Sequence, residues 1–225
     1  MQECVLSTDR RSVRTRQALR DALAREIGET GDLSRVTVTA VTERAGVTRR
    51  TFYSHFKDIP DLVNQIEEAA LMELRAPLAR LAACHLDDLR AALDQGRPAP
   101  GATELLTCVR ERGDYLRPLL GEGGDPAFAG RIKQLAHEVI GQRALEGLDL
   151  RALGPLFDYY LTFAISAEVG VLLRWLDGGM REGVGVMARL MTALMFVRPG
   201  DLYDNPIDLD LPSFALAAMC SEEDN

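Results

Sequence analysis

Residues 36–63 read VTVTAVTERAGVTRRTFYSHFKDIPDLV, and a single glycine separates two short helical patterns within them. Thr37 begins the first pattern, because a threonine hydroxyl can accept a hydrogen bond from the free N–H groups of a first helical turn. Gly46 ends that pattern, since glycine adopts the left-handed conformation of a tight turn without steric strain. Thr48 then caps a second helix from Arg49 to about Phe56. The order of cap, helix, glycine turn and cap predicts a helix-turn-helix.

The second of these helices has two different faces. At about 100° per residue, Phe52 and Phe56 point the same way, which predicts that they anchor the helix in a core. Arg50, Thr51 and Ser54 lie on the opposite face. A solvated basic helix of no special function would show the same division, so this pattern leaves both interpretations open.

The charge distribution favours a nucleic-acid partner for this segment. Residues 9–57 carry a net charge of +5 and the remaining residues −13, although the whole chain has a formal charge of −8. A local concentration of arginine attracts phosphate irrespective of the base sequence. We therefore expect the basic segment to contact DNA and the acidic remainder to serve another purpose.

The composition argues against several other classes of protein. Of the 225 residues 47% are hydrophobic and 27% charged, as in soluble globular proteins. The apolar runs are far shorter than the roughly 20 residues that span a bilayer, and the N-terminal residues lack a signal-peptide pattern, so we expect a cytoplasmic protein without membrane contact. The scattered Cys4, Cys84, Cys108 and Cys220 predict free thiols, although a redox-sensing cysteine remains open. The three histidines form no i, i+4 pair, so we expect neither a metal site nor a cofactor.

The rest of the chain shows further helical patterns. They cover about residues 13–29, 59–84, 103–120, 127–146, 156–176 and 180–197. Without a convincing strand pattern, the sequence predicts an all-α fold with about nine helices. We expect a helix-turn-helix DNA-binding domain over 9–57, a helical ligand-binding and dimerisation domain over 58–198, and an acidic, loosely ordered tail over 199–225.

Residues 36–63 also carry the run T-x-x-x-V-x-x-x-AGV-T-x-x-TFY-x-HF-K, which resembles the DNA-binding domain of the TetR/AcrR family of transcriptional regulators. The resemblance implies that Thr37 and Tyr53 contact phosphates and that the start of the second helix, Thr48 to Thr51, contacts base edges. It also implies that His55 and Lys57 approach the DNA backbone. With Ser54 from the exposed face, the predicted DNA contacts are Thr37, Thr48, Arg49, Arg50, Thr51, Tyr53, Ser54, His55 and Lys57.

Two of these positions have a more specific interpretation. Arg50 is the side chain best able to reach guanine O6 and N7 with both branches of its guanidinium group, whereas Arg49 lies nearer the packed side and suits a phosphate. Ile59, followed by Pro60, departs from the family, which commonly has a lysine there. We expect one phosphate contact to be lost and DNA binding to be retained.

The C-terminal half is similar to a more specific group. YLRPLLGEGGDPAFAGRIKQL (115–135) and YYLTFAISAEVGVLLRWLDGGM (159–180) resemble a TetR subgroup that includes regulators of dihydroxyacetone kinase operons. The family resemblance implies that helices over about 155–177 and 180–197 form a four-helix bundle between two protomers. The alternative is that these helices only complete the core of one subunit.

The family resemblance further implies a ligand cavity among the middle helices. For each candidate residue, plain core packing is the alternative, because apolar helical stripes ordinarily form cores. The candidates are Met72, Leu105, Cys108, Tyr115, Leu116, Phe128, Tyr160 and Phe163.

These observations predict a homodimeric, ligand-responsive repressor that binds a palindromic operator and is released or repositioned by a small-molecule effector. The first alternative is a ligand- or protein-binding member of the family that has lost operator binding. The second is an enzyme, for which the sequence shows no nucleophile beside a base, no paired carboxylates and no phosphate-binding loop. Neither the operator nor the effector is specified by the residues.

Overall fold

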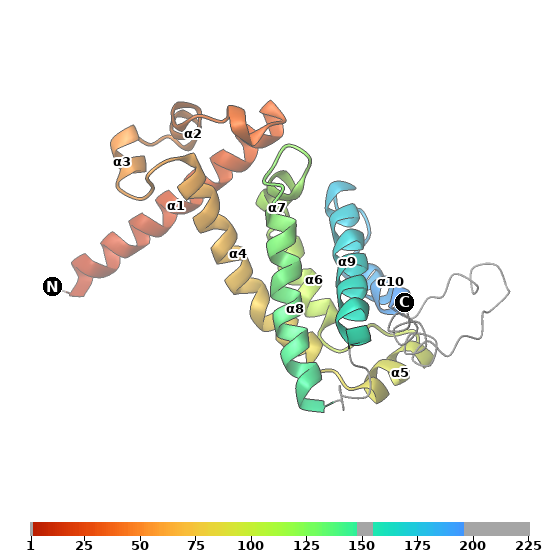
Figure 1. The fold of residues 1–225 in the computed structure, drawn as a ribbon. Helices are drawn as coiled ribbons and strands as arrows, with labels where there is room; N and C mark the ends of the chain where they lie inside the picture. Colours follow the sequence, from red (N-terminus) through yellow and green to blue (C-terminus); the bar gives the residue numbers. More distant parts are fainter. Residues whose placement is uncertain (1, 148–154, 196–225) are drawn as a thin grey trace, which may run out of the picture. The chain divides into compact units, whose positions relative to one another are not determined.

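The computed structural model describes residues 2–147 and 155–195, and this part of the chain contains ten α-helices, one 3-10 helix and no strand (Figure 1). The elements are α1 (Gln2–Thr30), η1 (Leu33–Arg35), α2 (Val38–Ala45), α3 (Arg49–Tyr53), α4 (Ile59–Ala82), α5 (Leu86–Asp94), α6 (Ala102–Glu111), α7 (Gly113–Leu120), α8 (Phe128–Gly147), α9 (Pro155–Asp177) and α10 (Val184–Leu194). The all-α class is confirmed. The predicted acidic tail, 199–225, lies outside the described residues.

Several helices differ from the predictions. α1 begins at Gln2 rather than near residue 13, because the residues before 13 include neither glycine nor proline to end a helix. α5 was not predicted, although Asp87 and Asp88 in its first turn suit the positive end of the helix dipole. The predicted helix over 103–120 is two helices, α6 and α7. They meet at Arg112–Gly113, where glycine weakens a continuous helix.

The chain forms two compact units, which are described separately. Unit 1 consists of Met1–Leu74, Thr107–Ile132 and Leu173–Arg181. Unit 2 consists of Arg75–Leu106, Lys133–Leu172 and the described residues from Glu182 onward. The predicted functional domains divide the chain at residue 58 instead, and that boundary stays a prediction.

Unit 1 is built around α1, which packs against α2 and α7 (Figure 1). Its core consists of apolar side chains from α1, α2, α3, α4 and α7 and from the turn after α3. The fully or almost fully buried ones are Leu19, Leu23, Ile27, Val41, Phe52, Phe56, Leu62, Leu116 and Leu119. Burial of this kind contributes about 1.5–3 kcal/mol for each large side chain, so these contacts fix the short helices α2 and α3 against α1.

The GEGGDP segment between α7 and α8 was predicted as a break, and it contacts the loop after α1. The Leu33 N–H donates a hydrogen bond of 2.7 Å to the Gly123 carbonyl oxygen. A Cβ added at Gly123 would lie 2.2 Å from the Gly31 carbonyl oxygen, so only glycine permits this approach. The loop after α7 is therefore part of the support of α1.

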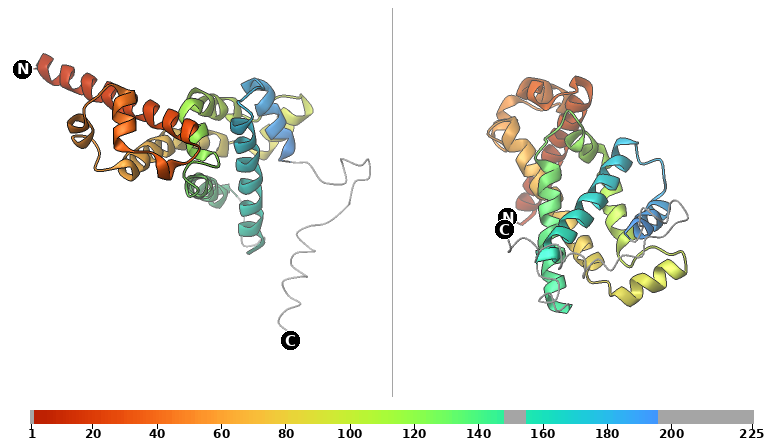
Figure 2. Two further views of the ribbon diagram at one scale, coloured as in Figure 1. Left: turned by 90° about the horizontal axis from the view of Figure 1, so that it is seen from above. Right: turned by 45° about the vertical axis from the view of Figure 1, so that its right-hand side comes forward.

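Unit 2 contains α5, α10 and parts of α4, α6, α8 and α9. α5 and α10 are in contact, and Figure 2 shows them (yellow and blue) in two further views. The Ala99 N–H donates to Thr192 Oγ1 at 2.8 Å, and the same hydroxyl donates to the Ala188 carbonyl at 2.8 Å. The buried Thr192 hydroxyl thus both accepts and donates a hydrogen bond, and it joins α10 to the segment that precedes α6.

Candidate nucleic-acid interface

The turn between α2 and α3 has the predicted geometry. Thr37 Oγ1 accepts a hydrogen bond from the Ala40 N–H at 3.2 Å and caps α2. Gly46 is left-handed, with φ 65° and ψ 32°, and its N–H donates to the Glu43 carbonyl at 3.2 Å. Thr48 Oγ1 accepts from the Thr51 N–H at 3.1 Å and caps α3. The local sequence signals for cap, turn and cap are thus confirmed.

The inner face of α3 is anchored by two phenylalanines. Phe52 is 0% and Phe56 4% exposed, and their ring centroids lie 5.7 Å apart. The exposed Tyr53 ring meets Phe52 edge-on, with centroids 5.5 Å apart. This packing presents the opposite face of α3 to solvent, as the sequence predicts.

α3 is shorter than predicted, because it ends at Tyr53 rather than near Phe56. Ser54 Oγ donates to the Thr51 carbonyl at 2.7 Å, and such side-chain bonds compete with continuation of a helix. The His55 and Phe56 N–H groups both donate to the Phe52 carbonyl at 2.9 Å. Ser54, His55 and Lys57 therefore lie in the turn that follows α3.

The nine predicted DNA contacts are all accessible. Seven are exposed: Thr37, Thr48, Arg49, Arg50, Tyr53, Ser54 and Lys57. Thr51 and His55 are half-exposed. All nine lie within residues 37–57 of unit 1 and are open to solvent. Their contacts with DNA stay a prediction.

Arg49 and Arg50 differ in their intramolecular partners. The Arg49 guanidinium donates to Thr39 Oγ1 of α2 at 2.5 Å, so it is tied across the turn. The Arg50 guanidinium has no hydrogen-bond or ion-pair partner within the described residues. Arg50 is accordingly the arginine of α3 that is available to an external partner.

An ion-pair cluster that was not predicted holds α2 to α1. The Arg44 guanidinium donates to Glu26 Oε1 at 2.5 Å and to Glu29 Oε1 at 2.7 Å. The hydrogen bond from Arg44 lowers the pKa of Glu29, and the two carboxylates raise the pKa of Arg44. Glu26 is 9% exposed and interrupts the apolar stripe of α1, which was the available sequence signal for a buried ionic partner.

The junction between α3 and α4 contains a reciprocal cap. Asp58 Oδ1 accepts from the Asp61 N–H at 2.8 Å, and Asp61 Oδ2 accepts from the Lys57 N–H at 2.8 Å. The bond from the Lys57 backbone is the main reason that the pKa of Asp61 is lowered. Ile59 opens α4 and is half-exposed, so the departure from the family lies beside the predicted phosphate contact Lys57.

The eight ligand candidates are divided between the two units. Cys108, Tyr115, Leu116 and Phe128 are buried in unit 1, and Leu105 is half-exposed in unit 2. Met72, Tyr160 and Phe163 are 77%, 51% and 71% exposed, because they project from the solvent side of α4 and α9. Three of the eight thus lie on the surface of the single chain, and the shared cavity stays a prediction.

Other possible sites have little support in the described residues. These residues include no cluster of three or more His, Cys, Asp or Glu side chains suited to a metal ion. Burial raises the pKa of the half-buried Cys84 thiol, which disfavours the reactive thiolate. None of the described helices combines the length and hydropathy needed to cross a membrane.

Comparison with protein families agrees with this geometry. Residues 19–66 match the family described as "Bacterial regulatory proteins, tetR family", and residues 97–196 match a TetR C-terminal family described as "Transcriptional regulator C-terminal region". The chain belongs to the TetR family. The predicted resemblance of residues 36–63 to the TetR family is thereby confirmed.

Individual relatives of this TetR-family protein are distant. It is 26% identical over 186 residues to the "Uncharacterized HTH-type transcriptional regulator YxbF" of Bacillus subtilis (strain 168), covering 80% of this chain and 44% of that protein. The chain thus spans less than half the length of this curated relative. A TetR transcriptional regulator from Streptococcus agalactiae 2603V has a similar fold, with a TM-score of 0.53 at 20% identity over 85% of this chain and 98% of that one.

Proposed function

We propose that this TetR-family protein is a cytoplasmic homodimeric repressor that binds a palindromic operator and is released by a small-molecule effector. The observation that carries the proposal is the exposed, unpaired Arg50 on a helix anchored by buried Phe52 and Phe56. A rigid helix with a free guanidinium group suits reading of guanine in the major groove. The similarity to regulators of dihydroxyacetone kinase operons stays part of this proposal.

The dimer is supported by an apolar surface on the last two helices. Tyr159 and Phe163 of α9 are 72% and 71% exposed. The other exposed apolar side chains of this surface, which we name the α9–α10 apolar face, are Tyr160, Val186, Leu190, Leu194 and Met195. Large apolar side chains gathered on consecutive helices are typical of a subunit interface. A dimer carries two α3 helices, one for each half of a palindrome.

The direct test is binding to DNA fragments from the promoter region of the gene that encodes the chain. We expect one fragment with a palindrome to bind two chains, and its affinity to fall steeply as salt rises. A protein that binds no fragment better than random DNA would contradict the proposal. That result would favour the alternative of a ligand- or protein-binding module without an operator.

Arg50→Ala should relax sequence preference. We expect it to reduce discrimination between the operator and a site with a substituted guanine by about 1–3 kcal/mol, because a bidentate contact to guanine is lost. Competition binding with the two DNA sites measures this difference. Lys57→Ala is the matched control, since loss of a phosphate contact should weaken binding to both sites equally. Equal weakening on both sites in Arg50→Ala would refute the role in base reading.

Ile59→Lys should strengthen DNA binding irrespective of sequence. A lysine at this half-exposed position beside Lys57 would restore the phosphate contact that the family commonly has. We expect several-fold tighter binding to operator and random DNA alike, and a plot of log affinity against log salt that is steeper by about 0.9. Ile59→Gln, which adds polarity without charge, should leave that slope unchanged. An unchanged slope in Ile59→Lys would mean that position 59 does not face the backbone.

A further inference from the structure

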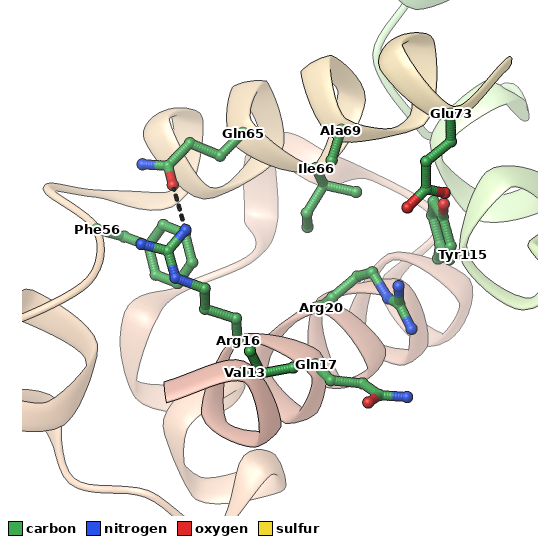
Figure 3. A pocket seen from close by; sticks show the side chains of 10 residues that line it. All are labelled: Val13, Arg16, Gln17, Arg20, Phe56, Gln65, Ile66, Ala69, Glu73 and Tyr115. Carbon is green, nitrogen blue, oxygen red and sulfur yellow. Dashed lines mark hydrogen bonds between the residues drawn. The ribbon is translucent and has the colours of Figure 1, made fainter. Parts of the chain in front are cut away.

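A cavity in unit 1 lies between α1 and α4, with α7 at one end. Its volume is about 340 Å³, within the size range of small-molecule sites. We call it the α1–α4 groove and define it by Arg16 and Arg20 of α1, Phe56 before α4, Ile66 and Glu73 of α4 and Tyr115 of α7. Figure 3 shows Arg16 beside Phe56 at one end of this groove and Arg20 beside Tyr115 at the other.

The Arg16 guanidinium is held in place without a counter-charge. It lies over the Phe56 ring at 5.7 Å from the centroid and donates to Gln65 Oε1 at 3.3 Å. Gln65 in turn donates to Asp61 Oδ1 at 3.1 Å, which orients its carbonyl oxygen toward Arg16. Within the described residues Arg16 has no carboxylate partner, so its charge is available to an anion.

The other charges of the groove do not neutralise Arg16. Arg20 lies 4.4 Å from the Tyr115 ring centroid and pairs with Asp21 Oδ1 at 3.1 Å. Glu73 pairs with Arg112, which lies outside the groove lining. Arg16 and Arg20 are four residues apart on one helix face, where like charges repel each other. An anion between them would remove this repulsion.

The floor of the groove is apolar. Phe56, Ile66 and Tyr115 are 4%, 7% and 5% exposed, and burial is the main reason that the pKa of Tyr115 is raised. Ala69 of α4 also lines the groove and is exposed at its surface. A ligand that fits therefore combines one negative group with a flat apolar body, because cations and aromatic rings alternate along the wall.

We propose that the α1–α4 groove binds a small aromatic carboxylate, with the carboxylate on Arg16 and the ring over Ile66 and Ala69. The competing role for Arg16 is a DNA phosphate contact, because Arg16 belongs to the basic segment 9–57. The inference stands apart from operator binding, because carboxylate binding is measured on the protein alone.

The test is calorimetric titration of the full chain with 2-naphthoate and, separately, with neutral 2-naphthamide. We expect 2-naphthoate to bind one site per chain, with a Kd of about 1 mM or tighter. The amide should bind at least ten-fold more weakly, because it lacks the charge that meets Arg16. Arg16→Gln should weaken naphthoate binding about ten-fold or more, since a charge-assisted hydrogen bond is lost.

Two further variants separate the groove from general charge effects. Ala69→Phe should also weaken naphthoate binding at least ten-fold, because the added ring fills the groove from an exposed position. Arg14→Gln removes the same charge from an exposed position of α1 outside the groove lining, and it should leave the Kd within two-fold of the unsubstituted value. Circular dichroism melting of the three variants checks that each is folded.

Four results would overturn the proposal. They are no heat of binding with 2-naphthoate, equal binding of the amide, an unchanged Kd in Arg16→Gln, and equal weakening in Arg14→Gln and Arg16→Gln. The last result would assign Arg16 to nonspecific attraction of anions, DNA phosphate included. If Arg16→Gln did not fold, Ala69→Phe alone would decide between a specific groove and none.

Discussion

Arg131→Met is expected to lower the free energy of unfolding by about 3–5 kcal/mol, because it leaves a carboxylate buried without a counter-charge. Glu67 of α4 is 0% exposed and forms an ion pair with Arg131 of α8. The Arg131 guanidinium also lies over the Phe128 ring, 5.8 Å from its centroid. Urea unfolding followed by circular dichroism measures the loss. A loss of about 3–5 kcal/mol is a large part of the total free energy of unfolding of a typical protein.

Two comparisons make this prediction specific to burial. Glu67→Leu combined with Arg131→Met should recover most of the loss, because an apolar pair can replace a buried ion pair. Arg75→Met breaks the exposed pair with Glu138, whose atoms are 3.3 Å apart, and should change stability by less than about 1 kcal/mol. If Arg131→Met were no more harmful than Arg75→Met, the buried pair would not be a determinant of stability.

The pH dependence of the variant has a definite sign. Without Arg131, the buried Glu67 carboxyl favours its neutral form, so its pKa in the folded variant lies above that in the unfolded chain. Stability is then retained at low pH and lost as pH rises through the folded pKa. The deficit of Arg131→Met should accordingly be smaller at pH 5 than at pH 8.

Phe163→Arg is expected to convert the dimer into a monomer. Phe163 of α9 is 71% exposed, and a charge there would be buried in the α9–α10 apolar face of the proposed dimer. Sedimentation velocity measures the oligomeric state. Operator affinity should fall about 100-fold or more, because the two DNA-binding helices no longer act as one bivalent unit.

Met72→Arg is the matched control for this prediction. Met72 is 77% exposed on α4 in unit 1, so the same substitution is made on an exposed apolar residue outside the α9–α10 apolar face. We expect Met72→Arg to remain dimeric. A dimeric Phe163→Arg would place the subunit contact on another surface.

The helix-turn-helix was predictable because its determinants are close in sequence. Thr37, Gly46 and Thr48 each act within about five residues, through caps and a left-handed turn. The alternation of apolar and polar positions then placed Phe52 and Phe56 inside and Arg50 outside. The predicted end of α3 was less accurate. Ser54 Oγ donates to the Thr51 carbonyl, and the sequence specifies helix ends only to within a residue or two.

The remaining features depend on residues far apart in sequence. Glu26 stood out as a charge in an apolar stripe, but its partner Arg44 is on the next helix. Glu67 pairs with a residue of α8, and the α1–α4 groove needs Tyr115 beside Arg20. No periodic pattern within one helix specifies which helix lies opposite. These contacts therefore needed the three-dimensional fold.

The contact between Gly123 and the loop after α1 bears on the engineering of chimeric regulators. A graft of residues 1–66 onto another body would carry all nine predicted DNA contacts but would leave behind α7 and the loop that receives the Leu33 N–H. Leu116 and Leu119, each 1% exposed, would be left behind with them. A transferable helix-turn-helix unit from this protein therefore consists of two separate stretches of chain. A graft intended to exchange DNA specificity has to include residues 107–132 as well.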